Sequence, residues 1–316
     1  MLRVVLALRG DSMRRRSLLL WFGLALFFGA CQAPASAPRG SEVIVVASKD
    51  FTEQDILGEL LAQQIERKTN LTVERKPRLG GSYVCHQAII NGKIDAYIEY
   101  TGTAATVSQL FQDRPIPTDA KRLYQELQTR YAQAFNLTML PSLGFENTFA
   151  IVIRGDDARQ NNIRTLSQAA QYTPQWRAGF GYEFAERQDG LAGLAKTYNL
   201  TFARSPQAMD LGLIYRALVQ KQIDLTAGNS TDGQIARLGL VILQDDKRYF
   251  PPYEAVPIVR TEVLQKYPQV KAAIAELAGL ITAEEMQKMN NAVEGELREP
   301  KTVVQEFLAA HPGSTP

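Results

Sequence analysis

From residue 43 onward, apolar runs of strand length alternate with stretches in which apolar side chains recur at helical spacing. The run Val43–Ala47 is apolar throughout and predicts a buried strand. In residues 52–65 the apolar positions share one helical face, and Thr52–Asp55 has the pattern of a capping box. Two further capping patterns, Thr282–Glu285 and Thr302–Gln305, predict helices near the C-terminal end. Such alternation is typical of an α/β fold.

Two segments of the chain resemble each other and form a possible internal repeat. Residues 85–101 align with residues 214–230 at a constant offset of 129, so that Asp95 falls on Asp224. Each copy has the pattern of a helix, a tight polar turn, a short strand and a polar loop. One such unit in each half of the chain predicts two similar lobes, and a chance match between two common units is the alternative.

Two strand-like segments, Thr148–Arg154 and Glu254–Arg260, follow turns rich in Gly or Pro. If the chain leaves one lobe near 147 and returns near 252, these segments are the crossover strands of a hinge. The predicted lobes are then 42–146 with 252–316, and 147–251. A cleft between hinged lobes commonly binds a small ligand and closes on it.

The N-terminal segment has the features of an export signal. Three arginines at 14–16 precede the uncharged run Leu18–Phe28, which is too short to span a bilayer but fits the apolar region of a signal peptide. The run leads into Gly-Ala-Cys, which resembles a bacterial lipobox. We therefore expect a lipoprotein signal peptide over 1–30, lipidation of Cys31 and a flexible tether over 31–41. A buried cysteine in an N-terminal helix is the alternative.

Composition and charge exclude some classes of protein. The 316 residues are 45% hydrophobic and 22% charged, which excludes a disordered chain. The 35 Lys and Arg nearly balance the 33 Asp and Glu, which argues against nucleic-acid binding. Removal of residues 1–30 leaves 30 basic and 32 acidic side chains, so the net charge changes from +2 to −2. Met13 is an alternative start to Met1, because residues 1–12 add nothing that a signal peptide needs.

Few residues have the chemistry of a metal or catalytic site. The two histidines, His86 and His311, and the two cysteines, Cys31 and Cys85, are scattered, which argues against a metal cluster. The sequence also lacks the G-x-S-x-G motif and the paired-carboxylate spacing of a hydrolase. We expect no metal, no cofactor and no enzymatic activity.

Six short motifs occur in a fixed order. They are SKDFTEQ (48–54), LGGSYVCH (79–86), EYTGT (99–103), EFAERQDG (183–190), STDG (230–233) and DKRYFPPY (246–253). As a set they resemble the substrate-binding proteins of ABC importers for glycine betaine, choline and related compatible solutes, over residues 43–310. The resemblance implies an α/β, two-lobe type II periplasmic-binding-protein fold, and an ABC permease with its ATPase as the partner.

The resemblance also implies which residues form the site. A quaternary ammonium group has no N–H to donate, but aromatic faces attract it, each by roughly 0.5–2 kcal/mol. The family builds a tyrosine cage around this group, and its betaine binders place Lys and Arg around the ligand carboxylate. By this resemblance Tyr100 and Tyr253 are cage walls and Thr103 lies beside Tyr100. Lys49 and Arg187 grip the carboxylate from opposite lobes.

Three more positions follow from the resemblance. Asn147 lies at the crossover, where the family places a polar or acidic contact. Phe149 stands where betaine binders usually have tyrosine, and it keeps the aromatic face. Asn229 replaces a second-lobe tyrosine and has no aromatic face, but it donates and accepts hydrogen bonds, which suits a more polar ligand. Loss of one wall should weaken binding by about 0.5–2 kcal/mol, or about two- to thirty-fold.

Simpler interpretations remain open for these residues. Lys49 could instead be a solvated lysine in a loop. Arg187 could instead belong to a surface ion-pair network with Glu183, Glu186 and Asp189. The two cage tyrosines have the alternative of core aromatics with satisfied hydroxyls.

The sequence thus predicts an exported, lipid-anchored, monomeric solute receptor on the periplasmic or cell-surface side of a bacterial membrane. Its ligand would be a small quaternary-ammonium or zwitterionic compound. The alternative is a binding lobe for a different polar ligand that acts as a signalling or accessory receptor.

Overall fold

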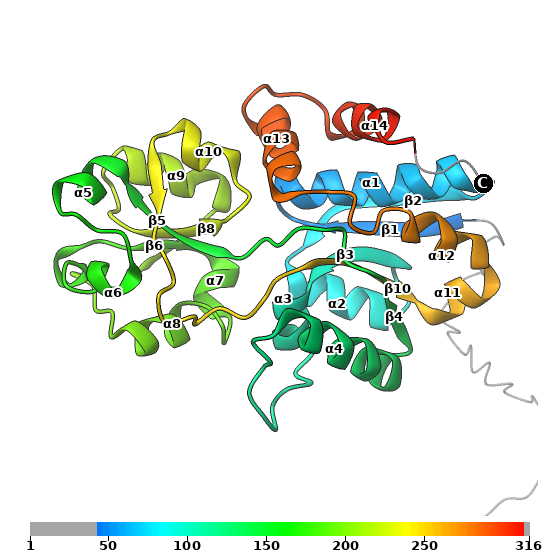
Figure 1. Cartoon of the computed structure of the whole chain (residues 1–316), viewed down its shortest axis with the longest axis horizontal. Coiled ribbons are helices and arrows are strands. Elements are labelled where there is room, and N and C mark those ends of the chain that lie inside the picture. Colours follow the sequence, from blue (N-terminus) through cyan, green and yellow to red (C-terminus); the bar gives the residue numbers. More distant parts are fainter. Residues whose placement is uncertain (1–42, 313–316) are drawn as a thin grey trace, which may run out of the picture. The chain divides into compact units, whose positions relative to one another are not determined.

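The computed structural model describes residues 43–312, which form two main β-sheets with helices packed on both faces of each (Figure 1). The predicted signal peptide, tether and lipidation site at Cys31 lie outside the described residues. Within 43–312, every helix is too short or too polar to cross a membrane.

The larger sheet has five strands, and we call it with its helices the large lobe. Strands β1, β2 and β3 run parallel, whereas β10 is antiparallel to both of its neighbours. In spatial order the strands are β2 (Thr72–Gly80), β1 (Val43–Lys49), β3 (Ala96–Tyr100), β10 (Ala255–Arg260) and β4 (Leu137–Met139). The strand predicted over Val43–Ala47 is confirmed as β1.

Side-chain alternation along β1 divides the large lobe into two cores. Ile44 and Val46 enter one core, and Val45 and Ala47 enter the other, because successive strand residues point to opposite faces. The helices of the first core are α1 (Thr52–Lys68), α11 (Thr261–Lys266), α12 (Pro268–Ala275), α13 (Ala283–Glu294) and α14 (Pro300–Ala310). Those of the second are α2 (Ser82–Ile90), α3 (Thr101–Val107) and α4 (Ala120–Phe135).

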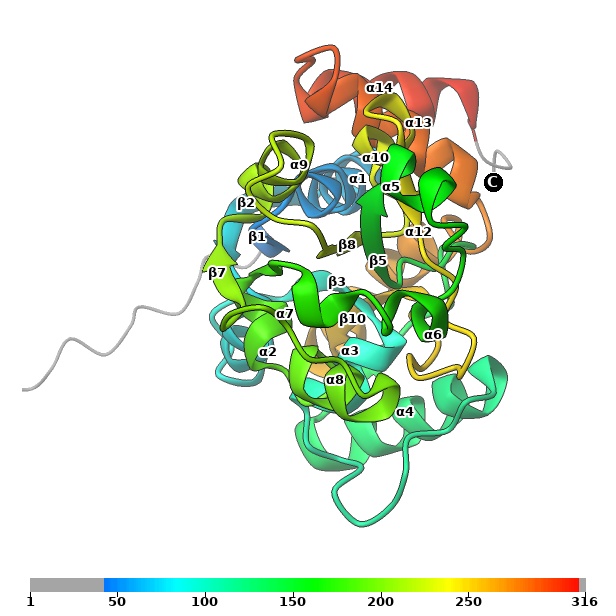
Figure 2. The ribbon, with the colours of Figure 1, turned by 90° about the vertical axis from the view of Figure 1, so that its left-hand side faces the viewer.

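The smaller sheet, with its helices, forms the small lobe (Figure 2). Its three antiparallel strands are β8 (Thr226–Asn229), β5 (Phe149–Arg154) and β9 (Leu240–Ile242), and a separate parallel pair is β6 (Gly179–Gly181) with β7 (Gln207–Met209). One core contains residues of α5 (Gly155–Gln160), α6 (Leu166–Ala169), α7 (Tyr182–Glu186) and α8 (Leu191–Tyr198). The other contains residues of α9 (Leu211–Val219) and α10 (Gly233–Arg237). A 3-10 turn covers Thr173–Gln175.

The two segments of the internal repeat form the same sequence of elements, as predicted. The first gives α2, a turn and β3, and the second gives α9, a turn and β8. In each turn an aspartate accepts a hydrogen bond from the backbone of a neighbouring segment: Asp95 from the amide of Val45 at 2.9 Å, and Asp224 from that of Arg177 at 2.9 Å. The aspartate therefore holds the turn before the strand in the same way in both lobes.

Two short segments cross between the lobes and lie side by side. Glu146 and Glu254 form an antiparallel bridge, and the Asn147 amide donates to the Tyr253 carbonyl at 3.0 Å. The two strands predicted at the crossover become β5 and β10, which belong to different sheets. The lobe limits near 147 and 252 stay a prediction.

The predicted helix caps have mixed outcomes. Thr282 and Glu285 form a capping box at the start of α13, as predicted. The capping box predicted at Thr52 is wrong, because the extended residue Phe51 precedes α1 without a side-chain cap. The cap predicted at Thr302 is also wrong, because α14 begins at Pro300, a residue suited to the first helical position.

His86 is buried in the second core of the large lobe. Its ring centroid lies 5.7 Å from that of Tyr131 and 5.1 Å from that of Phe135, both edge-to-face. Burial lowers the pKa of His86 to about 4 from its ordinary value of 6.5. Between these two values the unfolded chain binds a proton that the folded chain does not, so His86 lowers the free energy of unfolding as pH falls.

We therefore predict that His86→Phe makes the protein less sensitive to acid. From pH 7 to pH 5 the wild type should lose about 2 kcal/mol more of its unfolding free energy than the variant loses. Urea unfolding at both pH values measures this difference. Parallel pH dependences of the two proteins would contradict a neutral, buried His86.

Candidate functional site

A cavity of about 60 Å³, which we call the inner cavity, receives side chains from both lobes and from both crossing segments. All eight binding residues predicted from the sequence line it. They are Lys49, Tyr100, Thr103, Asn147, Phe149, Arg187, Asn229 and Tyr253. The other lining residues are Phe51, Ser82, Gly181, Glu183, Phe184, Leu211, Ala227 and Gly228. The structure thus brings the predicted residues together, and their contact with a ligand stays a prediction.

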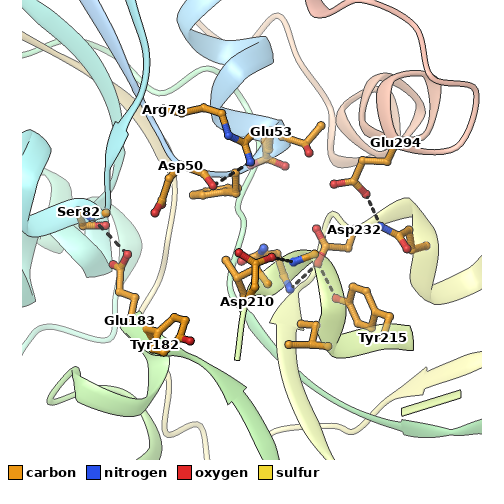
Figure 3. A pocket seen from close by; sticks show the side chains of 18 of the residues that line it. Asp50, Glu53, Arg78, Ser82, Tyr182, Glu183, Asp210, Tyr215, Asp232 and Glu294 are labelled. Atoms are coloured by element: carbon orange, nitrogen blue, oxygen red, sulfur yellow. Dashed lines mark hydrogen bonds between the residues drawn. The ribbon is translucent and has the colours of Figure 1, made fainter. Parts of the chain in front are cut away.

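A second space of about 390 Å³, the outer cavity, adjoins the first (Figure 3). The two cavities share Phe51, Ser82, Glu183, Leu211 and Asn229. Among the described residues, seven carboxylates line the outer cavity against one cation, Arg78. The carboxylates are Asp50, Glu53, Glu183, Glu186, Asp210, Asp232 and Glu294. A concave surface with this excess of negative charge attracts cations.

The two predicted cage tyrosines keep their hydroxyls in hydrogen bonds with the protein. Tyr100 donates to Glu53 at 2.6 Å, and Tyr253 donates to Asp189 at 2.6 Å. Burial, followed by the adjacent carboxylate, raises the pKa of each tyrosine well above its ordinary value. Because both hydroxyls are occupied, what each tyrosine offers to the cavity is its ring.

Phe149 is the centre of an aromatic cluster. Its ring centroid lies 4.8 Å from that of Phe184, 5.9 Å from that of Phe250 and 5.9 Å from that of Tyr253. These distances are typical of favourable aromatic pairs. The aromatic surface predicted at position 149 is therefore present, supported by rings from the small lobe and from the second crossing segment.

Asn229 ends β8, directly opposite Phe149 in the antiparallel register. Its backbone N–H donates to the carboxylate of Asp232 at 3.0 Å, and the hydroxyl of Tyr215 donates to the same carboxylate at 2.5 Å (Figure 3). Burial raises the pKa of Asp232 to about 7. These bonds fix the backbone at Asn229, so that its side chain lines both cavities.

Lys49 is not a solvated loop lysine. Its ammonium is 2% exposed and lies 2.5 Å from the carboxylate of Glu99, which is itself fully buried. The same ammonium donates to Ser82 at 3.4 Å and lies 4.4 Å from the ring centroid of Tyr100. Burial raises the pKa of Glu99, although the charge of Lys49 opposes this rise.

Arg187 belongs to an ion-pair network, but a buried one. Its guanidinium bonds both oxygens of Asp189, at 2.8 and 2.5 Å, and one oxygen of Glu183 at 3.0 Å. It also donates across the lobes to Thr103 at 3.0 Å, and it lies 5.1 Å from the ring centroid of Phe149. Burial alone would lower the pKa of Arg187, but the bonds to Asp189 raise it.

Four carboxylates and two cations thus lie in the wall of the inner cavity or directly behind it: Glu183 lines the cavity, and the other three bond to residues that line it. Glu53, Glu99, Glu183 and Asp189 outnumber Lys49 and Arg187 by two. The sequence reasoning predicted the cations but missed Glu53, Glu99 and Asp189 as site residues. Each of the three lies within one of the six motifs, and Glu99 and Asp189 lie one or two positions from a predicted site residue, which is the signal that could have found them.

Comparison with known proteins gives a consistent result. A model of the substrate-binding domain of ABC-type glycine betaine transport systems matches residues 42–310. The carnitine transport binding protein OpuCC of Listeria monocytogenes is 36% identical over 286 residues, which cover 90% of this chain and 92% of that protein. The ergothioneine transport permease/ergothioneine binding protein EgtU of Helicobacter pylori is 37% identical over 266 residues, 84% of this chain and 47% of that protein. A crystal structure of a glycine betaine/carnitine/choline ABC transporter protein matches with a TM-score of 0.70 and 32% identity, covering 85% of this chain and 98% of that chain.

The buried network around Arg187 predicts a strong dependence on the guanidinium group. Arg187→Lys keeps the charge but cannot bond both oxygens of Asp189 and still reach Thr103. We expect the unfolding free energy, measured in urea, to fall by about 2–4 kcal/mol.

Arg177→Lys is the matched control. Arg177 also bonds both oxygens of an aspartate, Asp224, but its side chain is 39% exposed. Exposed ion pairs contribute little, so this variant should lose much less stability. Equal losses in the two variants would show that burial of the Arg187 network is not what matters.

Proposed function

Since the chain belongs to the family of substrate-binding domains of ABC-type glycine betaine transport systems, we propose that it captures a small quaternary-ammonium compound in the inner cavity and delivers it to an ABC permease. The family is a transport family and not a class of enzymes. The fold is the two-lobe type II periplasmic-binding-protein fold that the resemblance implied.

The observation that carries this proposal is the combination of aromatic rings that line the inner cavity with surplus carboxylates in its wall and directly behind it. Tyr100 comes from the large lobe, Phe149 from the small lobe and Tyr253 from a crossing segment, and all three line the inner cavity. A quaternary ammonium ion is attracted by ring faces and by the two unbalanced negative charges around them.

The two cations leave room for a ligand carboxylate. Arg187 has five N–H donors, of which the described contacts use four, and Lys49 has three, of which they use two. A betaine or carnitine carboxylate would accept the remaining N–H of each. In this proposal the protein carboxylates hold the two cations in place, and each cation keeps one N–H for the ligand carboxylate.

We propose further that the chain is exported, cleaved before Cys31, lipidated there and active as a monomer. The uncharged run before Cys31 and the resemblance to a lipobox support this proposal. Labelling of the chain by a fatty acid in a bacterial host, and loss of the label in Cys31→Ser, would test it.

A ligand panel tests the function. We expect calorimetric titration of the exported Cys31→Ser chain with glycine betaine, choline, carnitine and ergothioneine to give saturable binding of at least one compound at micromolar concentration, without turnover. Glycine and ethanolamine, which lack the methylated head, are the matched controls and should bind far more weakly. If none of the four methylated compounds binds, or if any is converted to a product, the proposed function is wrong.

Asn229 provides a test of the reduced cage. We predict that Asn229→Tyr binds glycine betaine and choline about two- to thirty-fold more tightly, because the new ring opposite Phe149 adds about 0.5–2 kcal/mol of attraction for the cationic head. Titration of both compounds measures the change. Asn229→Leu supplies bulk without an aromatic face and should give no such gain; an equal gain in both variants would rule out the aromatic explanation.

A further inference from the structure

Glu53, in the first turn of α1, is a buried carboxylate with four hydrogen-bond donors around it. It is 2% exposed. One oxygen, Oε1, accepts from the hydroxyl of Tyr100 at 2.6 Å and from the side-chain amide of Asn147 at 2.8 Å. Tyr100 and Asn147 both line the inner cavity. This half of the carboxylate therefore belongs to the proposed binding site.

The other oxygen of Glu53 belongs to the contact between the lobes. Oε2 accepts from the hydroxyl of Thr231 at 2.5 Å and from the side-chain amide of Asn290 at 2.9 Å. Thr231 lies in the loop between β8 and α10 of the small lobe, and it is 1% exposed. Its side chain is not among those that line either cavity. Asn290, on α13 of the large lobe, also donates to the carbonyl of Thr231 at 3.0 Å.

We propose that Glu53 couples the ligand-binding ring of Tyr100 to closure of the small lobe through Thr231. This inference rests on the proposed function and makes Glu53 a positioning residue rather than a ligand contact. Oε1 bonds to Tyr100 at the inner cavity and Oε2 bonds to Thr231 of the small lobe. Because both oxygens belong to one rigid carboxylate, a shift at one is transmitted to the other.

The burial of Glu53 gives this coupling its strength. A carboxylate has about four acceptor sites, and four donors are present here. Among the described residues no lysine or arginine forms an ion pair with Glu53, so these neutral donors are what solvates its charge. A buried charge that loses a donor is destabilised, so a ligand that fixes Tyr100 also favours the geometry in which Thr231 can donate.

The competing explanation is that the hydrogen bond of Thr231 only stabilises the contact between the two lobes. In that case its loss should have the same effect on ligand affinity as the loss of any other hydrogen bond between the same segments. Gln287 on α13 provides such a bond, because it donates to the carbonyl of Ser230 at 3.1 Å without touching Glu53. Gln287→Ala is therefore the matched control for Thr231→Val.

The experiment measures ligand affinity and lobe closure in the Cys31→Ser chain. Dyes on Lys121→Cys in α4 and Arg159→Cys in α5, both exposed positions, report the distance between the lobes by energy transfer. Cys85 is buried and should not be labelled. The probes are choline and glycine betaine, and the variants are Thr231→Val, Thr231→Ser, Tyr100→Phe and Gln287→Ala.

We expect Thr231→Val to weaken binding of the tighter probe roughly tenfold or more and to reduce the ligand-induced change in energy transfer. Thr231→Ser, which keeps the hydroxyl, should restore both, and Gln287→Ala should stay within about twofold of the wild type. Wild-type affinity in Thr231→Val, or an equal loss in Gln287→Ala, would overturn the coupling.

Tyr100→Phe decides the inference independently of any ligand. It removes the hydroxyl that donates to Glu53 but keeps the ring in the large lobe. We expect it to shift the energy transfer of the ligand-free protein in the same direction as Thr231→Val does. If choline, glycine betaine, carnitine and ergothioneine all fail to bind the wild type, the proposed function fails, but this comparison still applies. An unshifted signal in Tyr100→Phe would then refute the coupling itself.

Discussion

The inner cavity depends on the burial of charge between two apolar lobes. Charged groups are costly to remove from water unless they are paired and hydrogen-bonded. Lys49 meets this requirement through Glu99, and Arg187 meets it through Asp189 and Glu183. Each cation also lies over an aromatic ring, Lys49 over Tyr100 and Arg187 over Phe149, so the ion pairs and the rings help to position one another.

The repeated unit explains why the two lobes contribute to the same place. In both copies a helix, a turn fixed by an aspartate and a short strand lead to the cavity. Tyr100 ends β3 and Asn229 ends β8, and the two are related by the offset of 129 that aligns the copies. One strand end therefore presents a ring and its counterpart an amide. This asymmetry, between positions that the fold treats alike, gives the small lobe a polar wall where the large lobe has an aromatic one.

The sequence predicted the parts of this protein that depend on local pattern and on motifs. Apolar periodicity was enough to locate β1 and α1, and the motifs were enough to bring eight side chains to one cavity. The pairing of Lys49 with Glu99 was not predictable, because the two residues are 50 positions apart and meet only when β1 and β3 lie in one sheet. The capping pattern at Thr52 was misleading for a related reason: the carboxylate of Asp55, which would complete the box, instead accepts hydrogen bonds from Ser48 and Arg78, and local spacing says nothing of such tertiary partners.

The surplus of carboxylates then bears on selectivity. The rings of Tyr100 and Phe149 each already attract a cation of the protein, so their attraction for a ligand is shared with Lys49 and Arg187. A cage of this kind distinguishes poorly between methylated heads, because ring faces respond to any cation of suitable size. The carboxylates respond to net charge instead, and those of the outer cavity extend the same negative potential into the space beside the inner cavity. Under the proposed function, discrimination against anions would therefore begin in the outer cavity. Discrimination among cations and zwitterions would fall to the few polar groups of the inner cavity, among them the remaining donors of Lys49 and Arg187 and the side-chain amide of Asn229.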